Sequence, residues 1–139
     1  MKKRALFLCT GNAARSQMAA GLANHDFGDR LEAFSAGVNP AGVSEFAIKA
    51  LDEIGIDISH ETSDHLSRYE DQLFDYVITV CDNADKNCPV FFGGVKRLHM
   101  PFPDPPHRGR DEEVMPVYRE VRDTIRRRLR EFFSRELQR

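Results

Sequence analysis

The amino-acid sequence predicts an α/β fold in three layers, with a parallel sheet covered by helices on both faces. Short apolar runs typical of buried strands alternate along the chain with the three- and four-residue spacing of amphipathic helices. The length of 139 residues suits one domain, large enough to bury about two-thirds of its unfolded surface. No repeat, linker or low-complexity stretch divides the chain, so we expect a single domain over residues 1–139.

In the first half of the chain we expect, in order, a strand at residues 3–8, a helix at 15–24, a strand at 31–36 and a helix at 44–54. The first strand is an apolar run that ends at a turn rich in small residues. Met18, Leu22 and neighbouring alanines give the first helix its apolar stripe. Gly37 closes the second strand. Ser44 is a favourable N-terminal cap for the second helix, and Gly55 is a favourable stop.

In the second half we expect strands at residues 74–80 and 95–98, followed by one long helix. Residues 74–80 are mostly β-branched or aromatic, which makes this the clearest strand. Apolar residues recur at three- and four-residue steps along the last segment, at Val117, Val121, Ile125, Leu129 and Phe132. Pro116 is expected near the first turn of that helix, where proline is tolerated. In such folds ligands bind at the carboxyl ends of the strands.

The composition excludes several classes of function. A formal net charge of −2 argues against non-specific nucleic-acid binding, which depends on neutralising many phosphates. The apolar runs are far too short to span a membrane, and the run after the basic residues 1–4 is too short for a secretory signal. We therefore expect a cytoplasmic protein. Three cysteines in a chain of this size favour reactive thiols over a disulfide framework.

The segment from Cys9 to Arg15 has the features of an anion-binding loop. It follows a strand, passes through Gly11 and opens a helix, so that successive backbone N–H groups turn towards one centre. Arg15 adds a planar fork that matches two oxygens of a phosphate-like group. The expected oxyanion-binding residues are Thr10, Gly11, Asn12, Ala13, Ala14 and Arg15. No Gly-Lys-Ser/Thr follows, so this is not a nucleotide-binding P-loop.

Cys9 is the expected nucleophile of this loop. The amides, the helix dipole and Arg15 stabilise a thiolate, and the hydroxyls of Ser16 and Thr10 can donate hydrogen bonds to its sulfur. A thiolate beneath a bound oxyanion is positioned for in-line attack. The alternative is a small buried cysteine at a strand end, with Arg15 on a solvated helix face.

Cys81 and Cys88 form a second feature. Cys81 directly follows the strand at residues 74–80, so it is expected at the same sheet edge as Cys9. Two cysteines at this spacing, with no nearby histidine, provide too few ligands for zinc. Two thiols that close to a disulfide supply two electrons for a reduction. The alternative is two unrelated buried cysteines. If residues 82–88 are helical, the two cysteines lie roughly 10 Å apart, so disulfide formation would unwind the segment.

Asp104 lies in a proline-rich run between Pro101 and Pro106. The prolines can hold its carboxyl group at the same sheet edge, where an acid can protonate a departing oxygen. A free aspartic acid is mostly ionised at neutral pH, so a solvated loop acid is the alternative. The histidines, His107 among them, show no metal-ligand spacing and are expected at the surface or rim.

Together these features resemble the thioredoxin-coupled arsenate reductases, which share the low-molecular-weight protein tyrosine phosphatase fold. The resemblance spans nearly the whole chain. It rests on Cys9-Thr10-Gly11-Asn12 with Arg15-Ser16-Gln17-Met18, Ser35-Ala36-Gly37, Thr62-Ser63-Asp64, Cys81 with Cys88, and Phe102-Pro103-Asp104-Pro105. The fold that it implies has four parallel strands in the order 2-1-3-4.

The resemblance also implies a relay of three thiols. Cys9 would form a thiol–arsenate adduct. Cys81 would then attack Cys9, which releases arsenite and leaves a Cys9–Cys81 disulfide. Cys88 would resolve it into a Cys81–Cys88 disulfide, which reduced thioredoxin would reopen by exchange. No tightly bound cofactor is expected.

The remaining roles implied by the resemblance are Arg15 with the loop amides as the oxyanion cradle, Ser16 as a support of the thiolate, and Asp104 as the general acid. Ala13 and Ala14 stand where relatives often carry serine and another small residue or cysteine, which leaves the backbone donors intact. Some relatives bind potassium beside the loop. Asn12, Ser35 and Asp64 match that site, but Ala20 replaces its glutamate, so potassium binding stays open and no other metal is expected.

Arsenate is therefore the expected substrate, with phosphate or sulfate as competing oxyanions, and a monomer is the expected state. The first rival is a low-molecular-weight phosphatase that hydrolyses phosphate monoesters such as phosphotyrosine, but it needs neither Cys81 nor Cys88. The second rival is a non-catalytic oxyanion-binding or redox-sensing module. Glutaredoxin or another thiol carrier could replace thioredoxin as the reductant.

Overall fold

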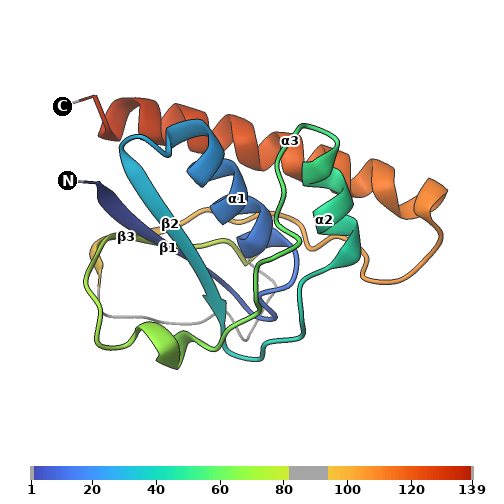
Figure 1. Cartoon of the computed structure of the whole chain (residues 1–139), viewed down its shortest axis with the longest axis horizontal. Coiled ribbons are helices and arrows are strands. Elements are labelled where there is room, and N and C mark those ends of the chain that lie inside the picture. Colours follow the sequence, from blue (N-terminus) through green and yellow to red (C-terminus); the bar gives the residue numbers. More distant parts are fainter. Residues whose placement is uncertain (1, 82–93, 139) are drawn as a thin grey trace.

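The computed structural model describes residues 2–81 and 94–138, and it has the α/β architecture that the sequence predicts (Figure 1). Its elements are, in chain order, β1 (Lys3–Cys9), α1 (Arg15–Phe27), β2 (Leu31–Gly37), α2 (Glu45–Asp52), the 3₁₀ helix η1 (Leu66–Tyr69), β3 (Phe74–Thr79), β4 (Gly94–His99) and α3 (Asp111–Glu136). The strands form one parallel sheet in the order β2-β1-β3-β4. The predicted sheet and its strand order are confirmed.

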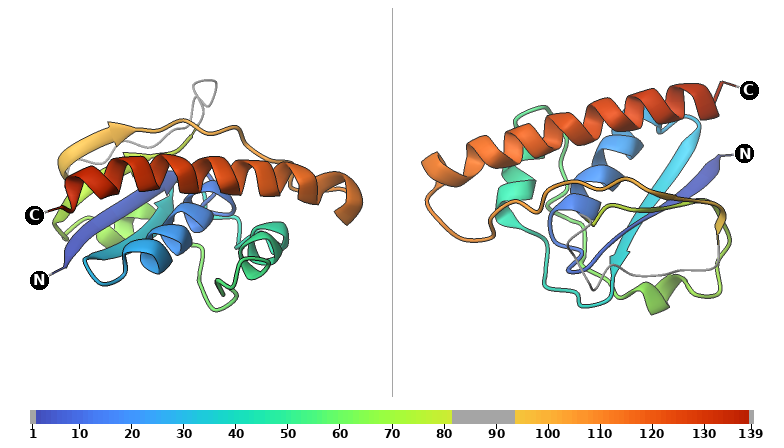
Figure 2. Two further views of the ribbon diagram at one scale, coloured as in Figure 1. Left: turned by 90° about the horizontal axis from the view of Figure 1, so that it is seen from above. Right: turned by 180° about the vertical axis from the view of Figure 1, so that it is seen from behind.

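The three α-helices pack on one face of the sheet, and α3 runs along both α1 and α2 (Figures 1 and 2). Ala5 and Phe7 of β1 point to this face and join the buried residues of these helices in one cluster. Leu6 and Leu8 point to the other face, where Tyr69 of η1 belongs to a smaller cluster. These four residues of β1 are fully buried, which explains why a central parallel strand is apolar almost throughout.

Two helical features differ from the sequence prediction. The helix η1 has only four residues, so it has no apolar period to reveal it, and it begins where His65 Nδ1 accepts a hydrogen bond from the Ser67 N–H. Pro116 lies inside α3, beyond its first turn. Proline lacks the N–H that would bond four residues back, but the helix continues because its neighbours Met115 and Tyr118 are buried in the core.

The carboxyl ends of β1 and β3 meet at one edge of the sheet. The Val80 N–H donates to the Leu8 carbonyl at 2.9 Å, and the Phe102 N–H donates to the Val80 carbonyl at 3.3 Å. The segments that leave β1, β3 and β4 therefore lie side by side. Cys9 and Cys81 both lie at this edge, because the carboxyl ends of parallel strands meet on the same side of a sheet.

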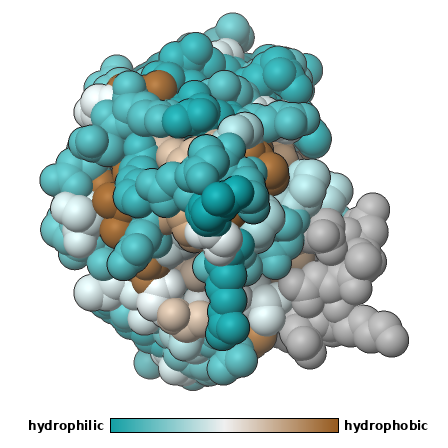
Figure 3. Space-filling model, turned by 90° about the vertical axis from the view of Figure 1, so that its right-hand side faces the viewer, coloured by the Kyte–Doolittle hydropathy of each residue, from teal (hydrophilic) through white to brown (hydrophobic). Residues whose placement is uncertain are grey.

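In the part of the chain that the structure describes, none of the helices is both long and apolar enough to cross a bilayer. Figure 3 shows one face, on which hydrophilic side chains predominate and apolar ones gather only in small patches between them.

An ionic cluster joins α1 to α3. The carboxylate of Asp26 accepts hydrogen bonds from Arg126 at 2.8 and 3.0 Å and from Arg130 at 3.2 Å. Arg126 is partly buried in this cluster, whereas the side chain of Arg130 stays 57% exposed. Burial by itself would raise the pKa of Asp26, but hydrogen bonds from Arg126 and His25 and the charges of both arginines outweigh it and lower that pKa from 3.8 to about 2.

The Asp26 cluster predicts how stability depends on pH. Since the folded-state pKa of Asp26 is depressed, its contribution is fully present above about pH 4 and is lost as the pH falls towards about 2, and it amounts to at most about 2 kcal/mol before solvent screening reduces it. Urea unfolding of wild type and Asp26→Asn should show a gap in free energy of unfolding at neutral pH that narrows across this window. Asp29→Asn, which removes an exposed carboxylate 3.7 Å from Arg30, is the matched control. A gap that does not change with pH would contradict the prediction.

Candidate active site

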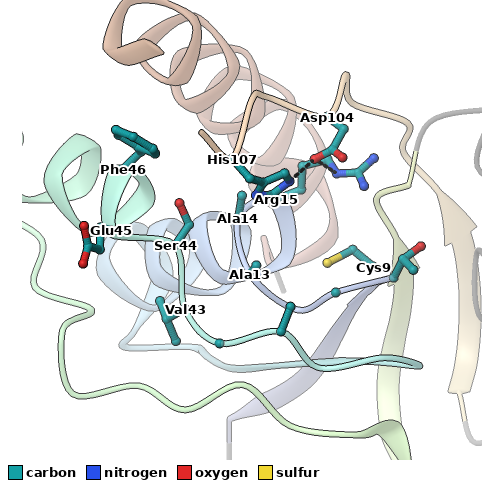
Figure 4. Close-up of a pocket in the computed structure, with 14 residues that line it drawn as sticks. Cys9, Ala13, Ala14, Arg15, Val43, Ser44, Glu45, Phe46, Asp104 and His107 are labelled. Carbon is teal, nitrogen blue, oxygen red and sulfur yellow. Dashed lines mark hydrogen bonds and ion pairs between the residues drawn. The ribbon is translucent and has the colours of Figure 1, made fainter. Parts of the chain in front are cut away.

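A pocket of about 460 Å³ opens beside Cys9 at the carboxyl edge of the sheet (Figure 4). Cys9 ends β1 and is 2% exposed. The loop that follows forms one wall of the pocket, and residues 41–46, which lead into α2, form another. Asp104 and His107 line it from the proline-rich segment after β4. Residues from three separate parts of the chain thus line the pocket beside Cys9.

The backbone of the loop is turned so that its carbonyl groups face outward. Five consecutive carbonyls accept hydrogen bonds from outside it: Thr10 from Asn39 N–H, Gly11 from Ala41 N–H, Asn12 from Gln17 Nε2, Ala13 from Ser44 N–H and Ala14 from Met18 N–H. Across a planar trans peptide the C=O and the next N–H point in opposite directions. The N–H groups of the loop are therefore directed towards the pocket, where they form a cradle for an anion.

Asn12 shapes this loop and supports Ser16. It is the one non-glycine residue with a positive φ, 47°, in the described part of the chain, and its Oδ1 accepts hydrogen bonds from the Asp64 N–H and from Gln17 Nε2. Its Nδ2 donates to Ser16 Oγ at 2.8 Å, and Ser16 Oγ lies 2.9 Å from Cys9 Sγ. Because Ser16 Oγ already accepts from Asn12, its own hydrogen is available to Cys9 Sγ. This arrangement stabilises a thiolate.

Arg15 lies at the start of α1 with its guanidinium beside the pocket. It is 4% exposed, its Nη1 donates to the Phe102 carbonyl at 3.3 Å, and its Nε lies 3.6 Å from Asp104 Oδ1. A buried arginine next to a ring of amides adds a permanent charge for an oxyanion. Asp104 also accepts a hydrogen bond from His107, whose Nε2 is 3.0 Å from the same Oδ1 (Figure 4). The sequence predicts His107 only as a surface or rim residue and does not indicate its contact with Asp104.

Cys81 lies beside the first residue of the loop. It is fully buried, and its Sγ is 4.0 Å from Thr10 Oγ1, the hydroxyl that directly follows Cys9 in the chain. Cys9 is a free thiol, and both cysteines are buried. Cys88, and the expected helix and its unwinding at residues 82–88, lie outside the described residues. The structure thus places Cys81 beside the residue that follows Cys9.

The residues that match a potassium site do not form an open cation site. Asp64 Oδ2 accepts hydrogen bonds from Arg68 Nη1 at 2.8 Å and from Thr62 Oγ1 at 2.9 Å. Asn12 Oδ1 is engaged by two donors, as described above, and Ala20 offers no oxygen. A guanidinium thus pairs with one carboxylate oxygen of Asp64, and potassium binding at these residues stays a prediction. Residues 2–81 and 94–138 contain no group of three or more His, Cys, Asp or Glu suited to a metal ion.

Three further residues shape the site without carrying a chemical signal in the sequence. Gln17, 2% exposed, also donates to the Thr62 carbonyl, and Ser63 Oγ donates to the carbonyls of Gly11 and Asn12. A Cβ on Gly37 would lie 2.6 Å from the Thr10 carbonyl oxygen and 2.7 Å from that of Cys9. Each residue lies within a motif quoted above, but no local pattern states what it contacts.

The chain is similar to known proteins along nearly its whole length. The pattern that defines the family described as low molecular weight phosphotyrosine protein phosphatase matches residues 4–139. An arsenate reductase from Halalkalibacterium halodurans is 45% identical over 132 residues, which cover 94% of this chain and 95% of that protein. A solved structure of an arsenate reductase in the phosphate binding state has a TM-score of 0.81 at 28% identity, covering 96% of this chain and 98% of the other. A thioredoxin-dependent arsenate reductase from Corynebacterium glutamicum has a TM-score of 0.72 at 27% identity, covering 99% of this chain and 64% of the other.

Proposed function

The chain belongs to the low molecular weight phosphotyrosine protein phosphatase family, and we propose that within this family it is an arsenate reductase that works through three thiols. The observation that carries the proposal is the position of Cys81, a buried cysteine beside the residue that follows Cys9. A phosphatase needs one thiol in this loop, because hydrolysis transfers no electrons. A second thiol at this place provides a route for reduction.

The first step is formation of an adduct on Cys9. Arsenate binds in the cradle of loop amides and Arg15, where its charge is balanced. The Cys9 thiolate, supported by Ser16, attacks arsenic, so an S–As bond forms as an As–O bond breaks. The departing oxygen takes a proton from Asp104 and leaves as water. Arsenic is still As(V) in this adduct.

The second and third steps move two electrons to arsenic. The Cys81 thiolate attacks the sulfur of Cys9, so that an S–S bond forms, the S–As bond breaks, and its electron pair leaves with arsenic as arsenite. The Cys88 thiolate then attacks the sulfur of Cys81, which frees the Cys9 thiolate and leaves a Cys81–Cys88 disulfide. Over these two steps arsenic gains two electrons, and the thiols of Cys81 and Cys88 lose two as they form the disulfide.

Reduced thioredoxin is the proposed electron donor that reopens the Cys81–Cys88 disulfide. The likeness to a thioredoxin-dependent arsenate reductase supports this choice. The relay needs thiols that start reduced, so we place the protein in the cytoplasm. We also propose that it is a single-domain monomer without a tightly bound cofactor.

A turnover assay tests this proposal. With arsenate, thioredoxin, thioredoxin reductase and NADPH, wild type should consume NADPH, whereas Cys9→Ser, Cys81→Ser and Cys88→Ser should each lose turnover by at least about 1000-fold. Cys81→Ser and Cys88→Ser should still hydrolyse para-nitrophenyl phosphate, since the cradle and Cys9 are intact. If wild type hydrolyses this ester but does not turn over arsenate, the reductase proposal fails.

A second candidate function is hydrolysis of phosphate monoesters. The pocket of about 460 Å³ is far larger than a single tetrahedral oxyanion requires, and its outer wall includes Val43 and Phe46. Such a wall can hold the organic group of an ester, phosphotyrosine among them. Comparing kcat/KM for arsenate and for phosphotyrosine in the wild-type protein decides which reaction the site favours.

A further inference from the structure

The proton for the departing oxygen requires a source that Asp104 alone does not explain. A free aspartic acid has a reference pKa near 3.9 and a free imidazole one near 6.5, so at pH 7 the imidazole holds a proton about 300 times as often. Arg15 Nε lies 3.6 Å from Asp104 Oδ1, so this carboxylate already pairs with a cation. The pocket therefore needs a second group that carries a proton near neutral pH.

His107 is positioned to be that group. Its Nε2 lies 3.0 Å from Asp104 Oδ1, and both residues line the pocket. Pro105 and Pro106 separate the two, and their restricted φ angles limit how far the backbone between them can vary. The side chain of His107 is 49% exposed, so it can regain a proton from solvent after each reaction.

We propose that His107 supplies the proton that Asp104 delivers to the departing oxygen, an inference that rests on the proposed attack of Cys9 on arsenate. The imidazolium donates from Nε2 to Asp104, and the carboxyl group passes a proton to the oxygen as the As–O bond breaks. One thiolate, one arsenate dianion and one proton then give the adduct dianion and one water. His107 acts through Asp104, not on the substrate itself.

The other titratable groups around the pocket define the expected pH profile. They are Cys9 at the end of β1, Arg15 at the start of α1 and Glu45 at the start of α2. Adduct formation needs the Cys9 thiolate, which gives a limb that rises with pH. It also needs the His107 imidazolium, which gives a limb that falls as the pH rises.

The test measures the first turnover, so that the pH dependence of thioredoxin does not enter. Reduced protein is mixed with arsenate, without thioredoxin, and arsenite release is followed from about pH 5 to about pH 9. His107→Gln keeps an N–H donor but does not titrate, and His107→Ala removes both. We expect both variants to lose the falling limb, with a rate at least about 10-fold below wild type at pH 7 and a smaller deficit near pH 5. The apparent KM for arsenate should change less than the rate.

A second exposed histidine–carboxylate pair serves as the matched control. His60 Nε2 lies 3.0 Å from Glu61 Oε2, outside the pocket, so His60→Gln should keep the wild-type profile. Profiles of both His107 variants that superimpose on wild type would overturn the inference, while wild-type reduction of arsenate upholds the proposed function. If wild type fails to reduce arsenate, the same profiles measured on phenyl phosphate hydrolysis decide the role of His107, since that leaving group needs the same proton.

Discussion

Gly37→Ala is expected to lower arsenate turnover at least about 100-fold, and to lower the free energy of unfolding by about 1 to 3 kcal/mol. The added Cβ would lie 2.6 Å from the Thr10 carbonyl oxygen, 2.7 Å from the Cys9 carbonyl oxygen and 3.0 Å from the Asn12 nitrogen. All three are backbone atoms, so no side chain can rotate away to relieve the contact. The loop itself has to move, and its amides then lose their alignment with the oxyanion. Steady-state turnover and urea unfolding measure the two effects.

Gly94→Ala separates loss of activity from loss of stability. Its Cβ would lie 2.5 Å from Val77 Cγ2, in the same sheet but at the amino-terminal end of β4, away from the pocket. We expect a comparable loss of stability with turnover per folded molecule close to wild type. If both glycine variants lose activity to the same extent, the Gly37 effect is one of folding and the proposed loop contact is not its cause.

Arg15→Lys is expected to lower kcat/KM for arsenate by about 100- to 1000-fold without a large change in stability. Lysine retains one positive charge but loses the planar fork that can contact two oxygens of the oxyanion at once. It also loses the geometry in which Nη1 holds the Phe102 carbonyl while Nε faces Asp104. Since Arg15 is 4% exposed, solvent does not replace these contacts.

Arg128→Lys provides the comparison for this change. The Arg128 guanidinium lies 5.9 Å from the centroid of the Phe102 ring, so it is close to the same residue but does not line the pocket. Its replacement should leave kcat/KM for arsenate within about twofold of wild type, as for other surface changes away from the site. A loss of less than about threefold in Arg15→Lys would mean that charge alone, not the fork, binds the oxyanion.

The local parts of the molecule follow from short stretches of sequence. Three consecutive elements show this: the strand Lys3–Cys9, the turn through Gly11 and the helix that begins at Arg15. An apolar run predicts the strand, small residues predict the turn, and an apolar stripe predicts the helix. The same holds for Ser44, whose side chain accepts a hydrogen bond from the Ala47 N–H as a cap should. Pro116 shows the limit of this reasoning, because core packing of α3 overrides the local preference of proline for a helix start.

The chemistry of the loop was therefore readable from order along the chain, because a thiol, a ring of amides and an arginine are set within seven residues. Contacts between distant segments could not be predicted, because hydrophobic periodicity and motif spacing inform only on residues that are close in the sequence. Only the folded chain places Cys81 beside Thr10 and the bare backbone of Gly37 against Cys9. The sheet makes these contacts by bringing the ends of parallel strands to one edge, where Thr10 and Cys81, 71 positions apart in the sequence, lie side by side.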